Sequence, residues 1–322
     1  MNEIACQDLP GSVDLNAVYR LLPKNPDDAY YKERTDRHLG WITQEEQQML
    51  RESTVGIAGC GGMGGLIAAT LMRLGIGGVR IADCEVFDAS NINRQFAGTR
   101  NNIGVSKAFA TARMIRDITD DTTLTVFPQG ITEETVDPFL QGLDVVCDEI
   151  EFWAIGARIL LHQEARKKGV SLFNCNTVGF GTRLFYFEPD GFTMEQTLGF
   201  TYEDAKALQI AIQQNKATPA DIKRAMGAVL TGLVPMLPEY SAEPLWSNRD
   251  DVCKRLFEEG RAAIIATNPP MASGFLANHI LFHLLRTKSK TKRDLALPMP
   301  MPGFLFFDAG THTANRVERK TI

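Results

Sequence analysis

The sequence predicts a Rossmann-like α/β fold with a mostly parallel sheet, and three observations support this fold class. An apolar, partly β-branched run at Thr54–Ala58 leads directly into a glycine-rich turn at residues 59–64. A helix-like apolar pattern follows over Gly65–Leu74. A second apolar run, Val79–Ala82, then ends at an acidic residue, Asp83. Because this order is typical of a nucleotide-binding βαβ unit, we expect a nucleotide pocket beside the glycine turn.

The segment before this unit carries prolines and charges without sustained periodicity. We therefore expect an N-terminal arm over residues 1–40 and not an independent domain. Thr43 and Glu46 have the spacing of a capping box, which predicts a short helix from Thr43 towards Arg51.

Alternating helix and strand patterns continue after Asp83 and complete a core over residues 41–200. Repeated βα units of this kind imply a mostly parallel sheet. The expected helices are Lys107–Ile118, Glu133–Leu140 and Trp153–Lys168, and the expected strands are Leu124–Phe127, Leu143–Cys147 and Ser171–Asn174.

Residues 201–260 differ in character and predict a variable helical insert. They are rich in Gln, Lys, Glu and Ala, and prolines at 219, 235, 238 and 244 interrupt them. Residues 261–322 return to core-like patterns, with an apolar helix over Ala272–Leu285 and a strand over Phe304–Phe307. We expect this C-terminal helix and strand to complete the core.

Composition bounds the class of protein. A chain of 322 residues with 44% hydrophobic content can bury one large core with appendages, and a net charge of -5 argues against a basic footprint for nucleic acid spread over the whole surface. The six cysteines form no C-x-x-C pair, so neither a zinc site nor a disulfide framework is predicted. No apolar run reaches the roughly eighteen residues of a membrane span, and the N-terminus lacks a signal pattern, so we expect a cytoplasmic protein without membrane contact.

The glycines and two later cations point to a triphosphate. Glycines let the backbone approach a phosphate, and the following helix N-terminus favours its negative charge. Lys107 follows Arg94 by thirteen residues. An NAD-dependent dehydrogenase has no obvious need for these cations, whereas a triphosphate attacked at its α-phosphorus does. Taken singly, Arg94 would be a surface ion-pair partner and Lys107 a solvated residue, but their joint spacing favours phosphate contact.

Several motifs agree in order and spacing with a known family. The sequence resembles the ThiF/MoeB superfamily of ubiquitin-activating-type, or E1-like, enzymes, which are ATP-dependent adenylyltransferases that activate carboxylates. The late helix after Pro270 and the strand Phe304–Asp308 resemble the closing elements of that family. The other matching motifs are Arg34-x-x-Arg37, Gly59-x-Gly61-Gly62-x-Gly64, Asp83-x-Glu85, Ser90-Asn91-x-x-Arg94-Gln95, Gly104-x-x-Lys107 and Asp144 to Glu151.

The resemblance implies roles for individual residues. Gly62 would contact the phosphates, Asp83 would bond the ribose, and Asn91 with Arg94 would lie near the triphosphate. Lys107 would stabilise the departing pyrophosphate. Arg37, Arg94, Lys107 and Glu151 are the implied catalytic residues, and the implied nucleotide site comprises Gly59, Gly61, Gly62, Gly64, Asp83, Ser90, Asn91, Asn93, Arg94, Lys107, Glu151 and Phe152.

The resemblance also implies a metal and a partner subunit. Glu151 stands where the family usually has the Asp that holds Mg²⁺, so the longer carboxylate is one metal candidate, Asp148 is a second and Glu149 a weaker third. The paired C-x-x-C motifs of many zinc-binding relatives are missing, so no zinc is predicted. Arg37 matches an arginine that reaches into the neighbouring subunit of homodimeric relatives, which implies a homodimer. Neither Cys175 nor Cys253 is assigned a catalytic role.

Alternatives for the substrate and the activity stay open. The carboxylate could belong to a ubiquitin-like or sulfur-carrier protein, a peptide or a small acid. Gly179-Phe180-Gly181 and Asn93-Arg94-Gln95 also resemble the tRNA threonylcarbamoyladenosine dehydratases, although the acidic balance makes RNA the less natural partner. Two other classes are an NAD-dependent oxidoreductase and an inactive nucleotide-binding module, the latter because Glu151 replaces the usual Asp. The basic run Arg286, Lys288, Lys290, Lys292 and Arg293 is more typical of a solvated loop at a helix C-terminus than of an RNA site.

Overall fold

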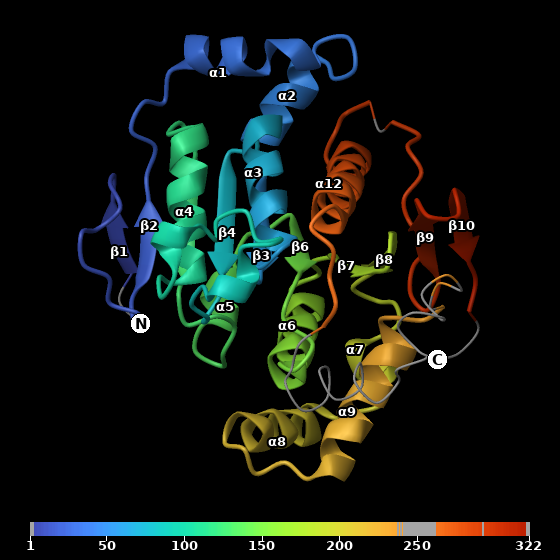
Figure 1. The fold of residues 1–322 in the computed structure, drawn as a ribbon. Coiled ribbons are helices and arrows are strands. Elements are labelled where there is room, and N and C mark those ends of the chain that lie inside the picture. Colours follow the sequence, from blue (N-terminus) through green and yellow to red (C-terminus); the bar gives the residue numbers. More distant parts are fainter. Residues whose placement is uncertain (1–2, 237, 239, 241–261, 292, 320–322) are drawn as a thin grey trace.

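The computed structural model describes residues 3–236, 238, 240, 262–291 and 293–319 (Figure 1). Within these residues the strands form one ten-stranded mixed sheet with the order β1-β2-β5-β4-β3-β6-β7-β8-β9-β10. The predicted Rossmann-like fold class is confirmed.

The middle of the sheet is parallel and changes direction at β3. From β3 (Thr54–Ala58) the chain moves outward through β4 (Gly78–Ala82) and β5 (Thr123–Phe127) on one side. It then crosses back to β6 (Val145–Asp148) and β7 (Leu172–Val178) on the other side. The loop that follows β3 therefore lies at the topological switch point, where ligands bind in open α/β sheets.

Helices cover the two faces of this parallel region. Residues of α3 (Gly64–Leu74), α4 (Lys107–Ile118) and α12 (Asn268–Thr287) pack in one apolar cluster against inward-facing strand residues such as Val55 and Ile57. A second cluster on the opposite face contains residues of α5 (Val136–Leu140) and α6 (Ile155–Lys167). Compared with the predicted ranges, α4 agrees at both ends, α5 begins three residues later and α12 is longer.

The edges of the sheet contain elements that the sequence did not predict. The segment expected to be an arm supplies β1 (Glu3–Cys6) and β2 (Val18–Leu21), and β2 pairs antiparallel with β5. Strands of four residues are too short to show a clear alternation of polar and apolar side chains. At the other edge, β8 (Gly181–Phe187), β9 (Phe304–Asp308) and the unpredicted β10 (Thr313–Val317) extend the sheet antiparallel, so β1 and β10 are its two edge strands (Figure 1).

The helices that precede β3 lie at one end of the sheet. They are α1 (Asp28–Thr35), the short 3₁₀ helix η1 (Asp36–His38) and α2 (Gln44–Arg51). The predicted capping box of α2 is present, because the Glu46 backbone N–H donates to Thr43 Oγ1 at 3.2 Å and the Thr43 N–H donates to Glu46 Oε2 at 2.9 Å. Two further 3₁₀ helices, η2 (Ala89–Asn91) and η3 (Arg100–Asn102), lie between β4 and α4.

The described part of the insert forms helices that extend one end of the molecule. These helices are α8 (Tyr202–Gln213), which packs against α6, and α9 (Pro219–Gly232), which packs against α7 (Met194–Leu198), a short helix just before the insert (Figure 1). The remainder of the predicted insert, residues 241–260, falls outside the described residues. Across the parts of the chain that are described, no helix is both long and apolar enough to cross a membrane.

Candidate nucleotide-binding site

The glycine turn after β3 divides into two pairs of positions. Gly59 has a φ of 102°, and a side chain there would overlap the backbone oxygen of Glu149. A side chain on Gly64 would overlap the backbone oxygen of Gly59. At Gly61 and Gly62 the nearest atoms would be at ordinary contact distances of 3.8 and 3.4 Å. The fold itself therefore requires the outer glycines, whereas a methyl group at either inner position would meet its neighbours at ordinary van der Waals contact.

Asp83, at the end of β4, fixes the start of this turn. Its Oδ2 accepts the Cys60 N–H at 2.7 Å, and its Oδ1 accepts the Glu85 N–H at 2.8 Å. The side chain is only 8% exposed, and this burial raises the pKa of Asp83 to about 6 although both N–H groups and Lys107 favour the charged form. The carboxylate has the place expected for a ribose ligand at the end of a second strand.

Lys107, the first residue of α4, lies among three carboxylates. Its Nζ is 2.6 Å from Glu85 Oε2, and the side chain is 7% exposed. Burial favours the neutral amine, but the charges of Glu85, Asp83 and Glu151 outweigh it and raise the pKa of Lys107. The structure thus places Lys107, at the start of α4, near Asp83, which follows β4, and near Glu151, which follows β6. Glu85 was part of the recognised motif, but its pairing with Lys107 was not predicted.

The loop that contains Ser90, Asn91, Asn93 and Arg94 lies against the turn. Arg94 is the residue whose Cγ faces Gly62, at 3.5 Å from the position of an added Cβ. Its Nη1 donates to the Ser90 backbone oxygen at 3.2 Å and to Asn93 Oδ1 at 3.0 Å. Asp88 caps η2, because its Oδ1 accepts the Ser90 N–H at 2.6 Å and the Ser90 hydroxyl at 2.5 Å, and its own N–H donates to Asn91 Oδ1 at 3.2 Å. In this arrangement Arg94 is beside the inner glycines, whereas Ser90 and Asn91 shape the loop that holds it.

The N-terminal end of α12 closes the other side of the site, which the sequence did not predict. Pro269 lies 3.4 Å from the position of an added Cβ at Gly62. Ser273 Oγ donates to the Met63 backbone oxygen at 3.2 Å, and the Asn268 side chain donates to the Gly179 backbone oxygen. The Asn-Pro-Pro sequence indicates a helix start, but no local pattern shows which loop that helix start will contact.

The acidic residues after β6 separate into buried and accessible ones. Asp148 is fully buried, with His162 Nε2 at 2.9 Å and Arg158 Nε at 3.5 Å from its Oδ2. Burial alone would raise the pKa of Asp148, but Arg158 and His162 together lower it. Glu151 is exposed, and its Oε1 accepts the N–H of Phe152 at 3.0 Å. Of the two main metal candidates, Glu151 is therefore the accessible carboxylate.

Glu149, the third metal candidate, points elsewhere. Its Oε1 is buried without a hydrogen-bond partner, and burial followed by the neighbouring Asp148 charge raises the pKa of Glu149. Considering only the described residues, no group of three His, Cys, Asp or Glu side chains could hold a metal ion by itself.

Arg37 lies far from the glycine turn of its own chain. It is exposed in η1, three residues after Arg34, which bonds to Met72 at the C-terminal end of α3, whereas the glycine turn precedes the N-terminal end of the same helix. The eleven residues of α3 span about 16 Å. The structure therefore does not bring Arg37 together with Lys107 and Arg94 within one chain.

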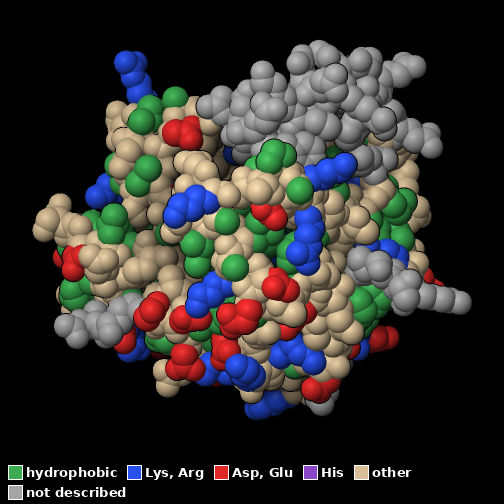
Figure 2. Space-filling view, turned by 90° about the horizontal axis from the view of Figure 1, so that it is seen from below, with side chains coloured by type: hydrophobic (Ala, Val, Ile, Leu, Met, Phe, Trp, Pro, Cys, Tyr) green, Lys and Arg blue, Asp and Glu red, His purple; other side chains and the backbone are tan. Residues whose placement is uncertain are grey.

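Cys175 is buried in the fold, and two residues of the basic run after α12 form ion pairs with acidic residues of the same chain. Cys175 is 2% exposed, and burial raises the pKa of its thiol, as expected for an inert buried cysteine. Cys253 and Lys292 lie outside the described residues. Lys288 Nζ is 2.8 Å from Asp144 Oδ1, and Arg293 Nε is 3.0 Å from Glu46 Oε1. Figure 2 shows that the described Lys and Arg side chains on one face are interspersed with Asp and Glu and form no continuous basic surface there.

Three curated relatives illustrate the similarity of this chain to known proteins. An uncharacterized protein of Mycobacterium tuberculosis is 37% identical over 138 residues, which cover 42% of this chain and 19% of that protein. The tRNA threonylcarbamoyladenosine dehydratase of Bacillus subtilis is 25% identical over 254 residues, which cover 76% of this chain and 92% of that protein. The sulfur carrier protein ThiS adenylyltransferase of Bacillus subtilis is 28% identical over 135 residues, covering 41% and 40%. The chain thus spans less than two thirds of the first and third relatives.

Solved structures share the fold. PaaA superposes with a TM-score of 0.60 at 14% identity, covering 92% of this chain and 75% of that chain. E. coli MccB, solved with ATP, superposes with a TM-score of 0.57 at 12% identity, covering 92% and 73%. The model of the ThiF family matches residues 35–319, and so this chain belongs to the ThiF family.

Proposed function

We propose that this chain is an ATP-dependent adenylyltransferase that converts a substrate carboxylate into an acyl-adenylate and releases pyrophosphate. The observation that carries the proposal is the position of Lys107. A lysine side chain only 7% exposed is held by Glu85, close enough to Asp83 to feel its charge, and Asp83 in turn accepts the Cys60 N–H in the glycine turn. A triphosphate lying on that turn would receive positive charge from both Lys107 and Arg94.

The reaction follows from this arrangement. A carboxylate oxygen of the substrate attacks the α-phosphorus, and a new P–O bond forms while the bond to the bridging oxygen of the β-phosphate breaks. Pyrophosphate leaves with that electron pair. Lys107 and Arg94 stabilise the charge that develops on the leaving group, and Asp83 holds the ribose so that the α-phosphorus stays in line with the attacking oxygen.

Glu151 fits a role as the protein ligand of Mg²⁺. Mg²⁺ is commonly bound by one or two carboxylates together with substrate phosphates and water, so a single accessible carboxylate is a sufficient protein contribution. Glu151 is exposed and close enough to Lys107 to influence its pKa, whereas Asp148 is engaged by Arg158 and His162. A bound Mg²⁺ would neutralise phosphate charge in that position.

The active form that we propose is a homodimer. Because Arg37 lies beyond the far end of α3, it can act at a nucleotide only in a second copy of the chain. Trp41 and Leu39, close to Arg37, are 83% and 45% exposed. Large exposed apolar side chains of this kind are typical of interface anchors. Phe96 and Ile92, in the loop of Arg94, are 55% and 44% exposed and offer a complementary apolar surface.

A protein or peptide carboxylate is the substrate class that we favour. Several relatives carry names that refer to sulfur-carrier or ubiquitin-like proteins, and MccB has been solved with a peptide. A modified tRNA is the second candidate, because the dehydratase of Bacillus subtilis aligns over most of both chains. The net charge of -5 and the internal pairing of Lys288 and Arg293 support the protein or peptide. Five described cysteines are free, which supports a reducing compartment such as the cytoplasm.

The test is ATP/pyrophosphate exchange with purified protein and candidate carboxylates. The panel contains a sulfur-carrier protein ending in Gly-Gly, a peptide acid, free amino acids and threonylcarbamoyladenosine-bearing RNA. We expect exchange with one protein or peptide carboxylate, and loss of exchange in Lys107→Ala. Hydride transfer to NAD without exchange would instead indicate an oxidoreductase. Tight ATP binding without exchange, unchanged in Glu151→Asp, would indicate an inactive module.

A further inference from the structure

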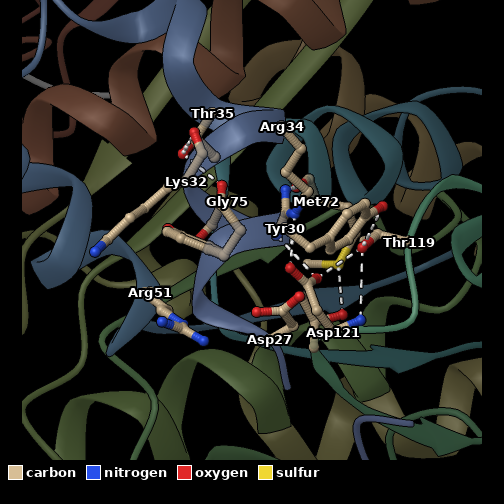
Figure 3. Close-up of polar contacts among 12 residues, drawn as sticks. Asp27, Tyr30, Lys32, Arg34, Thr35, Arg51, Met72, Gly75, Thr119 and Asp121 are labelled. Carbon is tan, nitrogen blue, oxygen red and sulfur yellow. Dashed lines mark hydrogen bonds and ion pairs between the residues drawn. The ribbon is translucent and has the colours of Figure 1, made fainter. Parts of the chain in front are cut away.

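Arg34, in α1, bonds both to Asp121, in the loop after α4, and to Met72, in α3 (Figure 3). Its Nε and Nη2 donate to the two carboxylate oxygens of Asp121 at 2.7 and 3.0 Å. Its Nη1 donates to the backbone oxygen of Met72, in the last turn of α3, at 2.8 Å. The side chain of Asp121 is fully buried and that of Arg34 is 12% exposed. A bidentate ion pair of this kind fixes the orientation of the guanidinium relative to the carboxylate as well as the distance between them.

Tyr31 makes a second attachment to the same end of α3. Its hydroxyl donates to the backbone oxygen of Gly75 at 2.7 Å. Gln47, from α2, donates to the Tyr31 hydroxyl and to the backbone oxygen of Leu74, both at 2.9 Å. Helix C-terminal ends carry carbonyl groups without partners, and here side chains from α1 and α2 satisfy them. α1, α2 and α3 are thereby joined at one place.

Arg37 lies immediately after the residues that make this attachment. Arg37 follows Arg34 by three residues and lies in η1, which continues directly from α1. At the last residue of η1, His38 Nδ1 is hydrogen-bonded to Gln47 Oε1 at 3.0 Å. Arg37 itself is exposed and makes no ion pair within the described residues. The exposed guanidinium of Arg37 is therefore carried by a backbone segment that Arg34 attaches on one side and His38 on the other.

We propose that Arg34, through Asp121 and Met72, is a positioning residue for Arg37, and that its function is to hold Arg37 in the direction needed to reach the nucleotide of a second copy. This inference rests on the proposed function. A catalytic group displaced by about 1 Å can lose roughly 100-fold in rate. A buried, three-donor attachment limits such displacement, which an exposed side chain on a free loop would not do.

The experiment is a double-mutant cycle on ATP/pyrophosphate exchange with Arg34→Ala, Arg37→Ala and the double variant. If Arg34 acts through Arg37, Arg34→Ala alone lowers kcat by up to about 100-fold and has no further effect once Arg37 is Ala. ATP affinity measured by calorimetry stays unchanged, because the glycine turn is not altered. Asp121→Asn, which keeps one acceptor, should give an intermediate loss.

Arg51→Ala is the matched control. The guanidinium of Arg51 lies 4.5 Å from the Tyr31 ring centroid, close to the 4.8 Å of Arg34, but it pairs with the exposed Asp28 and not with Asp121. We expect little change in exchange. If Arg34→Ala does not fold, Arg34→Lys and Asp121→Asn replace it in the cycle.

The outcomes separate the inference from the proposed function. If Arg34→Ala lowers kcat by the same factor in the unsubstituted protein and in Arg37→Ala, the inference is overturned and the role of Arg34 is purely structural. Full activity of Arg37→Ala would also overturn it and leave adenylation intact. Absence of exchange in the unsubstituted protein with every carboxylate would overturn both.

Discussion

Gly59 and Glu149 are so close that the backbone oxygen of Glu149 occupies the place where a side chain of residue 59 would be. This contact joins the end of β3 to the end of β6 and sets the path of the glycine turn. It also distinguishes the turn's structural glycines from those that would contact phosphate.

The first prediction uses this division of the glycines. Gly61→Ala and Gly62→Ala should fold with nearly unchanged thermal midpoints, because their added Cβ atoms would meet only ordinary contacts of 3.8 and 3.4 Å. Both should bind ATP much more weakly, since the methyl group would occupy the space for phosphate. Gly59→Ala and Gly64→Ala should lose stability by about 1–3 kcal/mol or more. Calorimetric titration with ATP and thermal unfolding measure the two effects separately, and unchanged ATP affinity in Gly62→Ala would falsify this location of the phosphates.

The second prediction concerns Lys107. Lys107→Met should reduce pyrophosphate exchange by about 100-fold or more, because a preorganised positive charge near the leaving group is removed. The loss should appear mainly in kcat. Lys223→Met, at an exposed position of α9, is the control and should leave exchange unchanged. Equal activity of the two variants would count against a role of Lys107 in pyrophosphate departure.

The third prediction is a pH dependence of stability that comes from Asp83. Its pKa is about 6 in the folded chain and 3.8 in the unfolded reference, so the folded state holds this proton to a higher pH. The associated stability is fully present below pH 3.8 and is lost as pH rises through about 6. The difference is about 3 kcal/mol. The free energy of unfolding, measured by denaturant titration between pH 4 and 7, should fall less with rising pH in Asp83→Asn than in the unsubstituted protein. The same pH dependence in both proteins would contradict a buried environment that disfavours the charged carboxylate.

The fourth prediction tests whether the chain forms a dimer in which Arg37 acts at the nucleotide site of the partner chain. Trp41→Ser should shift the chain from dimer to monomer in sedimentation experiments, because an 83% exposed Trp is the largest apolar group beside Arg37. Mixing Arg37→Ala with Lys107→Ala should restore part of the exchange activity, since one hybrid site then has both residues intact. Absence of any recovery, with dimers still present, would exclude action across the interface.

The fifth prediction concerns the basic run after α12. Arg293→Ala should lower the free energy of unfolding by about 1–3 kcal/mol, because Glu46 is 2% exposed and would lose its cationic partner. Lys290→Ala, at an exposed position without an ion pair among the described residues, is the control. A large loss of RNA affinity with unchanged stability would point to nucleic-acid contact instead.

Much of the fold could be predicted because its signals are local. The β3-turn-α3-β4 unit has apolar patterns and a chain reversal within about thirty residues. The capping box at Thr43 needs only two residues with the right spacing. By contrast, β1 and β2 have four residues each, too few to show a period.

The sequence proposes a set of site residues but not the contacts that those residues make. Asp83, Arg94 and Lys107 follow from motif order. Their partners do not, because Arg34 meets Asp121 across 87 positions and Asn268 meets Gly179 across 89 positions of sequence. That Asp148 is buried against Arg158 and His162 while Glu151 is exposed depends likewise on the packing of α6 against the end of β6. Contacts between distant segments depend on packing, which no local pattern contains.

Helix α3 connects the glycine turn to the attachment point of α1 and α2. Its first residue, Gly64, closes the glycine turn, and its last turn carries the carbonyl groups held by Arg34 and Tyr31. A genetic screen for inactive variants should therefore recover α3 substitutions for two unrelated reasons. In the proposed dimer, substitutions near Gly64 would weaken nucleotide binding in the chain that carries them, whereas substitutions in the last turn would impair the site of the partner chain. Activity measured in mixtures with the unsubstituted chain would tell the two groups apart.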